Sequence, residues 1–157
     1  MFRSFLRFVA ALVLSGTMSA ALADDTILTI RSADGVSRSF TMDELEAMPK
    51  VGFTTKTVWT EGPHHFTGPS LKAVLEAAGA RGTTISARAL NDYTIQIPFE
   101  SLEDGAPIIA TRIDGEHFPR REKGPLWIVY PYDSARKYQA EIIYGRSIWQ
   151  LSDLSVD

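Results

Sequence analysis

The residues of this chain that could do chemistry are concentrated in one short stretch, which contains Trp59, Glu61, His64, His65 and Phe66. A histidine pair with a carboxylate could hold a metal ion or act in acid-base catalysis. Adjacent histidines on an extended segment point to opposite faces, so they rarely bind one ion together. The alternative interpretation of the stretch is that its aromatic side chains belong to the core and its histidines face solvent.

The elements that must position this cluster lie between residues 54 and 79. Residues 54–59 are mostly β-branched and predict a strand, which a turn at Gly62-Pro63 ends. A helix follows, with Pro69 at its first position and Gly79 as a left-handed C-cap, and its apolar face consists of Leu71, Val74, Leu75 and Ala78. A strand end and a helix N-terminus should therefore meet around the cluster, where a small ligand can be bound.

The rest of the chain predicts short strands. A hairpin is expected over residues 26–31 and 36–40, and Thr41 and Glu44 form a capping box before a short helix. Further strands are expected at 84–90 and 93–99 around the turn Asn91-Asp92, at 107–113 before the turn Asp114-Gly115, and at 126–131, 140–144 and 147–156. Residues 98–104 could be helical, and 119–125 form a loop. The fold class is α+β, one mixed domain of mostly strands with two short helices.

Length and composition favour a single exported domain. The chain has 157 residues, 45% of them hydrophobic and 22% charged, which suits one domain. Arg3 and Arg7 precede an apolar run over residues 8–22, and Ala21-Leu22-Ala23 has a small-x-small cleavage pattern. We therefore expect residues 1–23 to be a signal peptide, residues 24–157 to be the domain, and the mature protein to be periplasmic.

Charge and cysteine content exclude several functions. The formal net charge is −3, and no basic run suggests a nucleic-acid partner. The chain contains no cysteine. A thiol nucleophile, a thiolate metal ligand and redox-active cysteine chemistry are therefore excluded for this sequence.

Ordered motifs over residues 41–149 resemble a known family. They are TMDELEAMP, FTGPSLKAVLEAAGA, a DY turn and IIATRIDGEHFPRREKGPLWIVYP. Together they resemble the oxidoreductase molybdopterin-binding domain of the sulfite-oxidase-like fold. Family enzymes bind molybdenum through a cysteine on the strand before the helix, which corresponds here to the neighbourhood of Lys56, Thr57 and Val58. The family's pterin-phosphate arginine corresponds to Trp127. Without the thiolate and the guanidinium, no molybdenum is expected.

A smaller group with this fold is similar in both departures. These are short periplasmic pterin-binding regulators that act on a membrane-anchored signalling enzyme, such as a cyclic-di-GMP enzyme or a histidine kinase. The resemblance implies a pterin, possibly reduced, as the ligand and the periplasmic segment of a membrane sensor as the partner. A pterin needs aromatic faces and in-plane polar groups. The candidates are Trp59, Phe66, Tyr93, Trp127, Tyr130 and Tyr132 for the first, and Thr57, Glu61, His64, Asn91, Asp92 and Arg121 for the second.

Three functions follow from the sequence as alternatives. The first is a non-catalytic pterin-binding protein of the periplasm. The second is an enzyme, either an oxidoreductase subunit of the molybdopterin-dependent type or one that uses His64, His65 and Glu61. The third is a chaperone-like or purely structural interaction domain with an empty pocket. Separately, Trp127 and Tyr130 could serve as core on the strand LWIVYP instead of binding a ligand. What copurifies with the protein would discriminate among the three.

Overall fold

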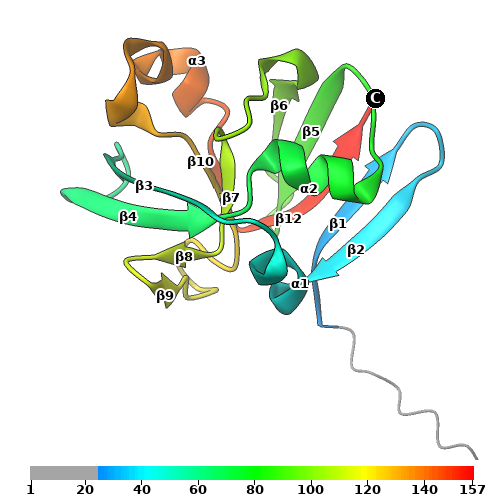
Figure 1. The fold of residues 1–157 in the computed structure, drawn as a ribbon, viewed down its shortest axis with the longest axis horizontal. Coiled ribbons are helices and arrows are strands. Elements are labelled where there is room, and N and C mark those ends of the chain that lie inside the picture. Colours follow the sequence, from blue (N-terminus) through cyan, green and yellow to red (C-terminus); the bar gives the residue numbers. More distant parts are fainter. Residues whose placement is uncertain (1–24) are drawn as a thin grey trace, which may run out of the picture.

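The computed structural model describes residues 25–157; the expected signal peptide over residues 1–23 lies outside them. Three sheets and three short α-helices form an α+β domain, as expected from the sequence (Figure 1). The largest sheet has the strand order β2-β1-β12-β5-β6. Its strands are β1 (Thr26–Ser32), β2 (Ser37–Thr41), β5 (Thr84–Ala89), β6 (Thr94–Pro98) and β12 (Leu151–Val156).

Local signals in the sequence account for much of this half of the domain. β1 and β2 form the expected antiparallel hairpin, while β1 and β12 run parallel. The capping box is present at the start of α1 (Met42–Ala47): the Glu44 amide donates to Thr41 Oγ1 at 3.2 Å, and the Thr41 amide donates to the Glu44 carboxylate at 2.8 Å. Asp92, in the turn between β5 and β6, has φ 66°, as expected of an Asn-Asp turn.

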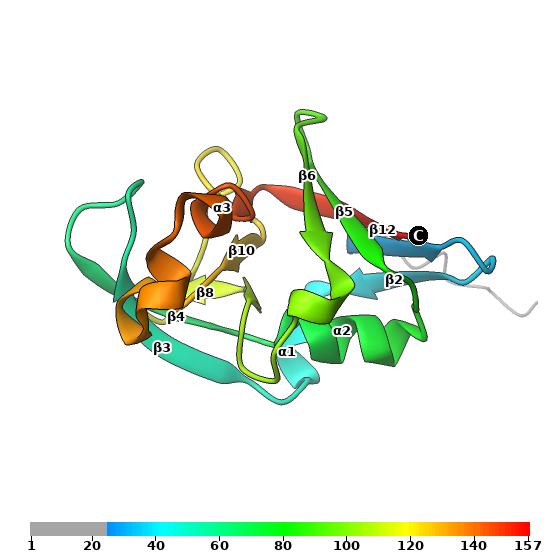
Figure 2. The same cartoon turned by 90° about the horizontal axis from the view of Figure 1, so that it is seen from above.

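Two smaller sheets form the other half. One has the order β3-β4-β8-β9, and the other has β10 between β11 and β7. Their strands are β3 (Val51–Lys56), β4 (Pro63–Gly68), β7 (Ile108–Ala110), β8 (Arg112–Ile113), β9 (Glu116–His117), β10 (Trp127–Val129) and β11 (Ile148–Trp149). Figure 2 shows the β3–β4 hairpin at one end of the molecule and the β1–β2 hairpin at the other.

The central prediction, a strand over residues 54–59 that leads into a loop, is wrong at its end. β3 stops at Lys56, residues 57–62 form a hairpin loop, and the expected loop at 63–68 is the return strand β4. Pro63 occupies the first position of β4, where a strand tolerates proline. The Gly62-Pro63 pair therefore turns the chain back on itself, with Phe53 paired to Phe66 across the two strands.

The helix after β4 also begins later than predicted. Ser70 is its N-cap, with Oγ accepting from the Ala73 amide at 3.1 Å, so Pro69 precedes the cap. α2 runs over Leu71–Ala78, and its predicted apolar face is buried. Gly79 ends it in the left-handed conformation with φ 73°, as expected.

Three other predicted strands differ in the structure. The strand over 107–113 divides into β7 and β8, and the strand over 147–156 divides into β11 and β12 at Gln150, which has φ 53°. Residues 140–144 form a third short helix, α3 (Glu141–Tyr144). The β-branched Ile142 and Ile143 favour a strand, but the Ala140 carbonyl accepts from the amides of Ile143 and Tyr144.

Short 3-10 helices complete the fold at Phe99–Ser101, Tyr132–Ser134 and Arg136–Gln139. The predicted buried strand at 126–131 is confirmed at its centre: β10 covers Trp127–Val129, and every residue from Leu126 to Tyr130 is buried, whereas Pro131 is half-buried. Within residues 25–157, no helix is long and apolar enough to cross a membrane.

Candidate functional site

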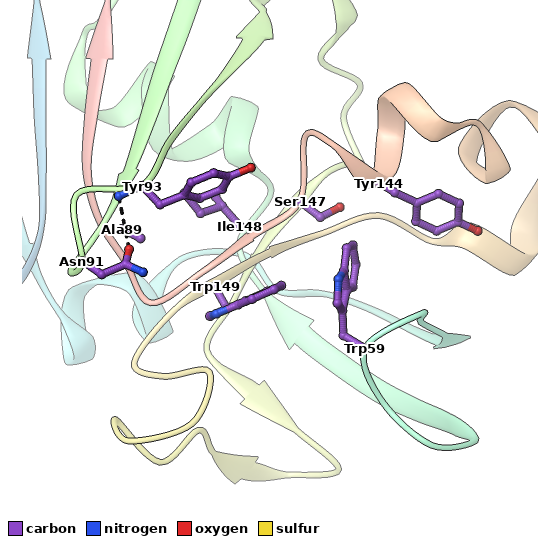
Figure 3. A pocket seen from close by; sticks show the side chains of 8 residues that line it. All are labelled: Trp59, Ala89, Asn91, Tyr93, Tyr144, Ser147, Ile148 and Trp149. Carbon is purple, nitrogen blue, oxygen red and sulfur yellow. Dashed lines mark hydrogen bonds between the residues drawn. The ribbon is translucent and has the colours of Figure 1, made fainter.

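A pocket of about 290 Å³ opens where three segments meet (Figure 3). The 57–62 loop contributes Trp59, the β5–β6 turn contributes Asn91 and Tyr93, and the end of α3 with the segment that follows it contributes the opposite side. The full lining is Trp59, Ala89, Asn91, Tyr93, Tyr144, Ser147, Ile148 and Trp149. Four of these eight side chains are aromatic, so the pocket offers flat apolar faces with a few polar groups beside them.

Trp59 is presented to this pocket by the turn it belongs to. Thr57 Oγ1 accepts from the Trp59 amide at 3.0 Å and lies 2.8 Å from Thr60 Oγ1. The Trp59 indole makes edge-on contacts with four other rings, at centroid distances of 5.6 Å to Trp149 and up to 6.2 Å to the others, which are Trp127, Tyr144 and Tyr132. The indole is therefore half-buried and held in place on a loop.

A second pocket, of about 440 Å³, lies against Trp59 as well. Its lining, unlike that of the first pocket, includes charged side chains: Trp59, Thr60, Glu61, His64, Ile113, Phe118, Pro119, Glu122 and Lys123. The Lys123 ammonium lies 5.0 Å from the ring centre of Trp149 and 5.6 Å from that of Trp127, which is a cation-π arrangement. Trp59 is thus shared by an aromatic pocket and a charged one.

His64 is bound at both ring nitrogens. Its Nδ1 lies 2.6 Å from Asp114 Oδ2, and its Nε2 lies 2.9 Å from the backbone carbonyl oxygen of Glu61. The hydrogen bond to Asp114, helped by the carbonyl of Glu61 and opposed by burial, raises the pKa of His64 above its ordinary 6.5. His65 points away and its Nδ1 lies 3.1 Å from Thr54 Oγ1.

The structure brings five of the predicted site residues to the two pockets. Trp59, Asn91 and Tyr93 line the first pocket, and Trp59, Glu61 and His64 line the second. The Asn91 side chain is oriented by its carbonyl oxygen, which accepts from the Tyr93 amide at 3.2 Å. Thr57 does not line either pocket, but its hydroxyl stabilises the turn that carries Trp59.

Four predicted aromatic residues lie in the core instead. Phe66 and Trp127 have no exposed surface, and Tyr132 and Tyr130 are 1% and 3% exposed. They support the pocket from behind: Phe66 packs edge-on against Trp127 at 5.5 Å, and Tyr132 stacks on Tyr144 at 5.0 Å. Since their faces are covered by other side chains, they do not offer a free stacking surface.

The remaining two predicted residues line neither pocket. Asp92 forms an ion pair with Arg88 at 3.0 Å in the β5–β6 turn. Arg121 is exposed in the 119–125 loop. The residue type and sequence position of both predict a polar contact to the ligand, but the loop geometry directs their side chains elsewhere.

Several lining residues are not predicted by the sequence. Tyr144 and Trp149 lie in segments that predict only strands, and Lys123 lies in the loop expected at 119–125. The one available signal for Trp149 is its aromatic side chain beside Ile148 in an apolar segment. No local signal shows that these residues meet Trp59, because they lie far from it along the chain.

The side chains near the pocket do not suit a molybdenum centre. Lys56 and Thr57, in the neighbourhood that the resemblance assigns to the metal-binding cysteine, offer an amine and a hydroxyl but no thiolate. Trp127, at the position that the resemblance assigns to a phosphate-binding arginine, has a buried indole Nε1 without a hydrogen-bond partner. Among residues 25–157, no group of three or more histidine, cysteine or acidic side chains could hold a metal ion. The aromatic pocket, in contrast, suits a flat heterocycle.

Comparison with known proteins agrees with this fold. Among solved structures, the chain is similar to the sulfane dehydrogenase SoxCD from Paracoccus pantotrophus, with a TM-score of 0.65 and 17% sequence identity. The match covers 86% of this chain but only 39% of that protein, and at this identity it speaks for the fold alone. A search of curated proteins found no match. The family model of the oxidoreductase molybdopterin binding domain matches residues 16–138, so this chain belongs to that family.

Proposed function

We propose that this chain is a periplasmic, non-catalytic pterin-binding protein that regulates a membrane-anchored signalling enzyme. The observation that carries the proposal is the pocket at Trp59, which combines aromatic walls with a few polar groups on a fold whose family binds a pterin cofactor. The absence of any cysteine in the sequence separates the chain from family enzymes that hold molybdenum through a thiolate.

The pocket chemistry supports a pterin as the ligand. A pterin ring is flat and carries both donors and acceptors on its edges, so it needs an aromatic face and in-plane polar groups. Trp59 and Trp149 supply faces, and Figure 3 shows Asn91 and Tyr93 across the pocket from Tyr144. The Asn91 amide and the hydroxyls of Tyr93 and Tyr144 are polar groups of this lining, whereas the Ser147 hydroxyl is already hydrogen-bonded to Tyr132 and to the Ile143 carbonyl.

The location and the partner rest on other grounds. The basic start, the apolar run and the Ala21-Leu22-Ala23 pattern support export. Resemblance to short periplasmic regulators supports a membrane sensor as partner, either a cyclic-di-GMP enzyme or a histidine kinase. N-terminal sequencing of the protein from its native host should begin at or beside Asp24; an intact Met1 in a membrane fraction would contradict export.

Direct titration tests the ligand. A tetrahydropterin added anaerobically to the full chain should quench tryptophan fluorescence, since all three tryptophans of the chain lie in one ring cluster. Calorimetry should give one site per chain. Absence of both heat and quenching, with adenosine as a control for unspecific stacking, would contradict the proposal.

Metal content tests the alternative oxidoreductase. Protein produced in a host that makes the molybdenum cofactor should contain far less than one molybdenum per chain, because no thiolate is present to hold it. One molybdenum per chain with turnover of sulfite or a sulfoxide would establish the oxidoreductase function instead.

A further inference from the structure

His64 connects two parts of the candidate site that the sequence keeps apart. One partner is Asp114, in the turn between β8 and β9, and the other is the backbone carbonyl of Glu61, in the loop that carries Trp59. Asp114 is itself fixed. Its Oδ1 accepts from the His65 amide at 2.8 Å, and its own amide donates to the His65 carbonyl at 2.7 Å. The imidazole thus connects a fixed turn to the Trp59 loop.

The two contacts of His64 determine its charge. A carbonyl oxygen and an ionised carboxylate can only accept hydrogen bonds, while a neutral imidazole has a single N–H to donate. Both contacts are satisfied at once only by the imidazolium form, which donates from Nδ1 and from Nε2. On deprotonation one of the two nitrogens becomes an acceptor that faces another acceptor.

We propose that protonated His64 is a positioning residue that latches the 57–62 loop, and with it the Trp59 indole, onto the β8–β9 turn. The consequence for ligand binding rests on the proposed function: pterin affinity should be higher when His64 carries its proton. No residue in the latch itself has to touch the pterin, because the effect passes through the position of Trp59.

Several charged groups lie around His64. Asp114 on the β8–β9 turn is hydrogen-bonded to the imidazole and favours its protonated form, and Glu61, Glu122 and Lys123 line the same pocket as His64. On the neighbouring strand β3, the residue paired with His64 is the uncharged Thr55, and Lys56 stands next to it at the strand end. His65 lies on the other face of β4. The hydrogen bond to Asp114, with the Glu61 carbonyl and the charge of Asp114 adding to it against the effect of burial, raises the pKa of His64.

Nitrogen-15 NMR of the full chain tests the latch without any ligand. At pH 6.5 both ring nitrogens of His64 should be protonated, and the ring should titrate above its ordinary range. The indole N–H resonance of Trp59 should titrate with the same midpoint. In Asp114→Asn the His64 midpoint should move down. A neutral His64 with one protonated nitrogen at pH 6.5, or a Trp59 resonance that ignores its titration, would overturn the proposal.

Pterin titration over pH 5.5 to 8.5 tests the coupling to binding. The tetrahydropterin should bind about 2- to 10-fold more weakly above the His64 midpoint, which is the effect of one hydrogen bond. His64→Gln should bind with the high-pH affinity throughout. His65→Gln is the matched control, since it removes the neighbouring histidine without touching the latch, and it should keep the parent profile. If the affinity of His64→Gln depends on pH in the same way as that of the parent, the dependence arises from the ligand's own titration, and the coupling to His64 is overturned.

The two proposals fail in different ways. If the tetrahydropterin does not bind at any pH while the His64 and Trp59 resonances titrate together, the proposed pterin function is contradicted and the latch is supported. If the tetrahydropterin binds tightly while neither the Trp59 resonance nor the affinity changes with the titration of His64, the latch is contradicted and the proposed pterin function is supported.

Discussion

Two tryptophans in contact, Trp127 and Trp59, differ in almost everything except residue type. Their ring centres are 5.9 Å apart. Trp127 lies on β10, paired to Ala110 of β7 on one side and to Trp149 of β11 on the other, and has no exposed surface. Trp59 lies in a hairpin loop and lines two pockets. One indole therefore belongs to the fold and the other to the site.

The difference shows that the element carrying a side chain determines its use. A residue in a central strand is covered by its neighbours, so its burial stabilises the domain. A residue in a loop can keep part of its surface exposed, as the half-buried Trp59 does, so the same indole there can serve a ligand. Variants of the two tryptophans should separate stability from binding.

The largest effect is expected at Trp127. Trp127→Ala leaves a cavity in a region without exposed surface, and should lower the free energy of unfolding by roughly 3 to 5 kcal/mol. Urea unfolding followed by circular dichroism measures this loss. Trp127→Phe is the control: it keeps an aromatic ring and leaves a smaller cavity, and the Nε1 group that it removes has no partner, so it should cost less. Equal losses in both variants would contradict the role of Trp127 as core.

Trp59→Ala should affect binding more than folding. Loss of one aromatic wall should weaken tetrahydropterin binding by roughly 1 to 3 kcal/mol, or one to two decades in affinity. Calorimetric titration beside thermal melts measures both quantities. Leu75→Ala, in the buried face of α2, is the contrasting variant and should lose roughly 2 to 5 kcal/mol of stability. If Trp59→Ala binds the tetrahydropterin as tightly as the parent, or simply unfolds, then Trp59 is not a pocket wall and the contrast with Trp127 is contradicted.

The contrast between fold and site extends to pH. Glu46 on α1 accepts two hydrogen bonds from Arg112 on β8, at 2.7 and 2.9 Å. The hydrogen bonds and charge of Arg112, with Thr111 and His117 adding to them against the effect of burial, lower the pKa of Glu46 from 4.5 to about 2. Its stabilisation is therefore complete above pH 4.5 and is lost as the pH falls through 2. The pH dependence that His64 contributes has the opposite sign, because its pKa is raised in the folded protein. Its stabilisation is complete below pH 6.5 and is lost as the pH rises through the raised pKa.

Unfolding measured over a pH series tests the two signs separately. Glu46→Gln should lower stability at neutral pH, where the contribution of the Arg112 pair is complete, and should remove part of the further loss of stability between pH 4.5 and 2. His64→Gln should instead change the slope above pH 6.5. A Glu46→Gln variant with the same acid profile as the parent would show that the Arg112 pair does not hold α1 to β8.

The smallest effect is expected at Thr57. Thr57→Val removes the hydroxyl that accepts from the Trp59 amide and contacts Thr60, so the loop should hold Trp59 less well. We expect tetrahydropterin affinity to fall by about 0.5 to 1.5 kcal/mol, the value of one hydrogen bond. Thr54→Val is the matched control, because its hydroxyl contacts His65 on the same hairpin but away from Trp59. Equal losses in the two variants would argue against a specific role for the turn.

Local signals predicted much of the fold because they depend on a few neighbouring residues. The capping box at Thr41 and the left-handed Gly79 are confirmed, as is the burial of β10. The β4 strand was missed because Gly62-Pro63 marks a turn without showing which segment pairs afterwards. α3 was missed because the β-branched residues of EIIY favour a strand, and only contacts elsewhere in the domain decide between the two.

The sequence by itself determined the family resemblance, the absence of a thiolate ligand and the stretch around Trp59 where the site lies. Tertiary structure alone decided which aromatic rings form pocket walls and which form core, and it brought Asp114 to His64 across 50 positions of chain. The physical reason is one of range. Turn and cap preferences act over a few residues, whereas the burial of Trp127 and the charge of His64 depend on groups that become neighbours only after the chain has folded.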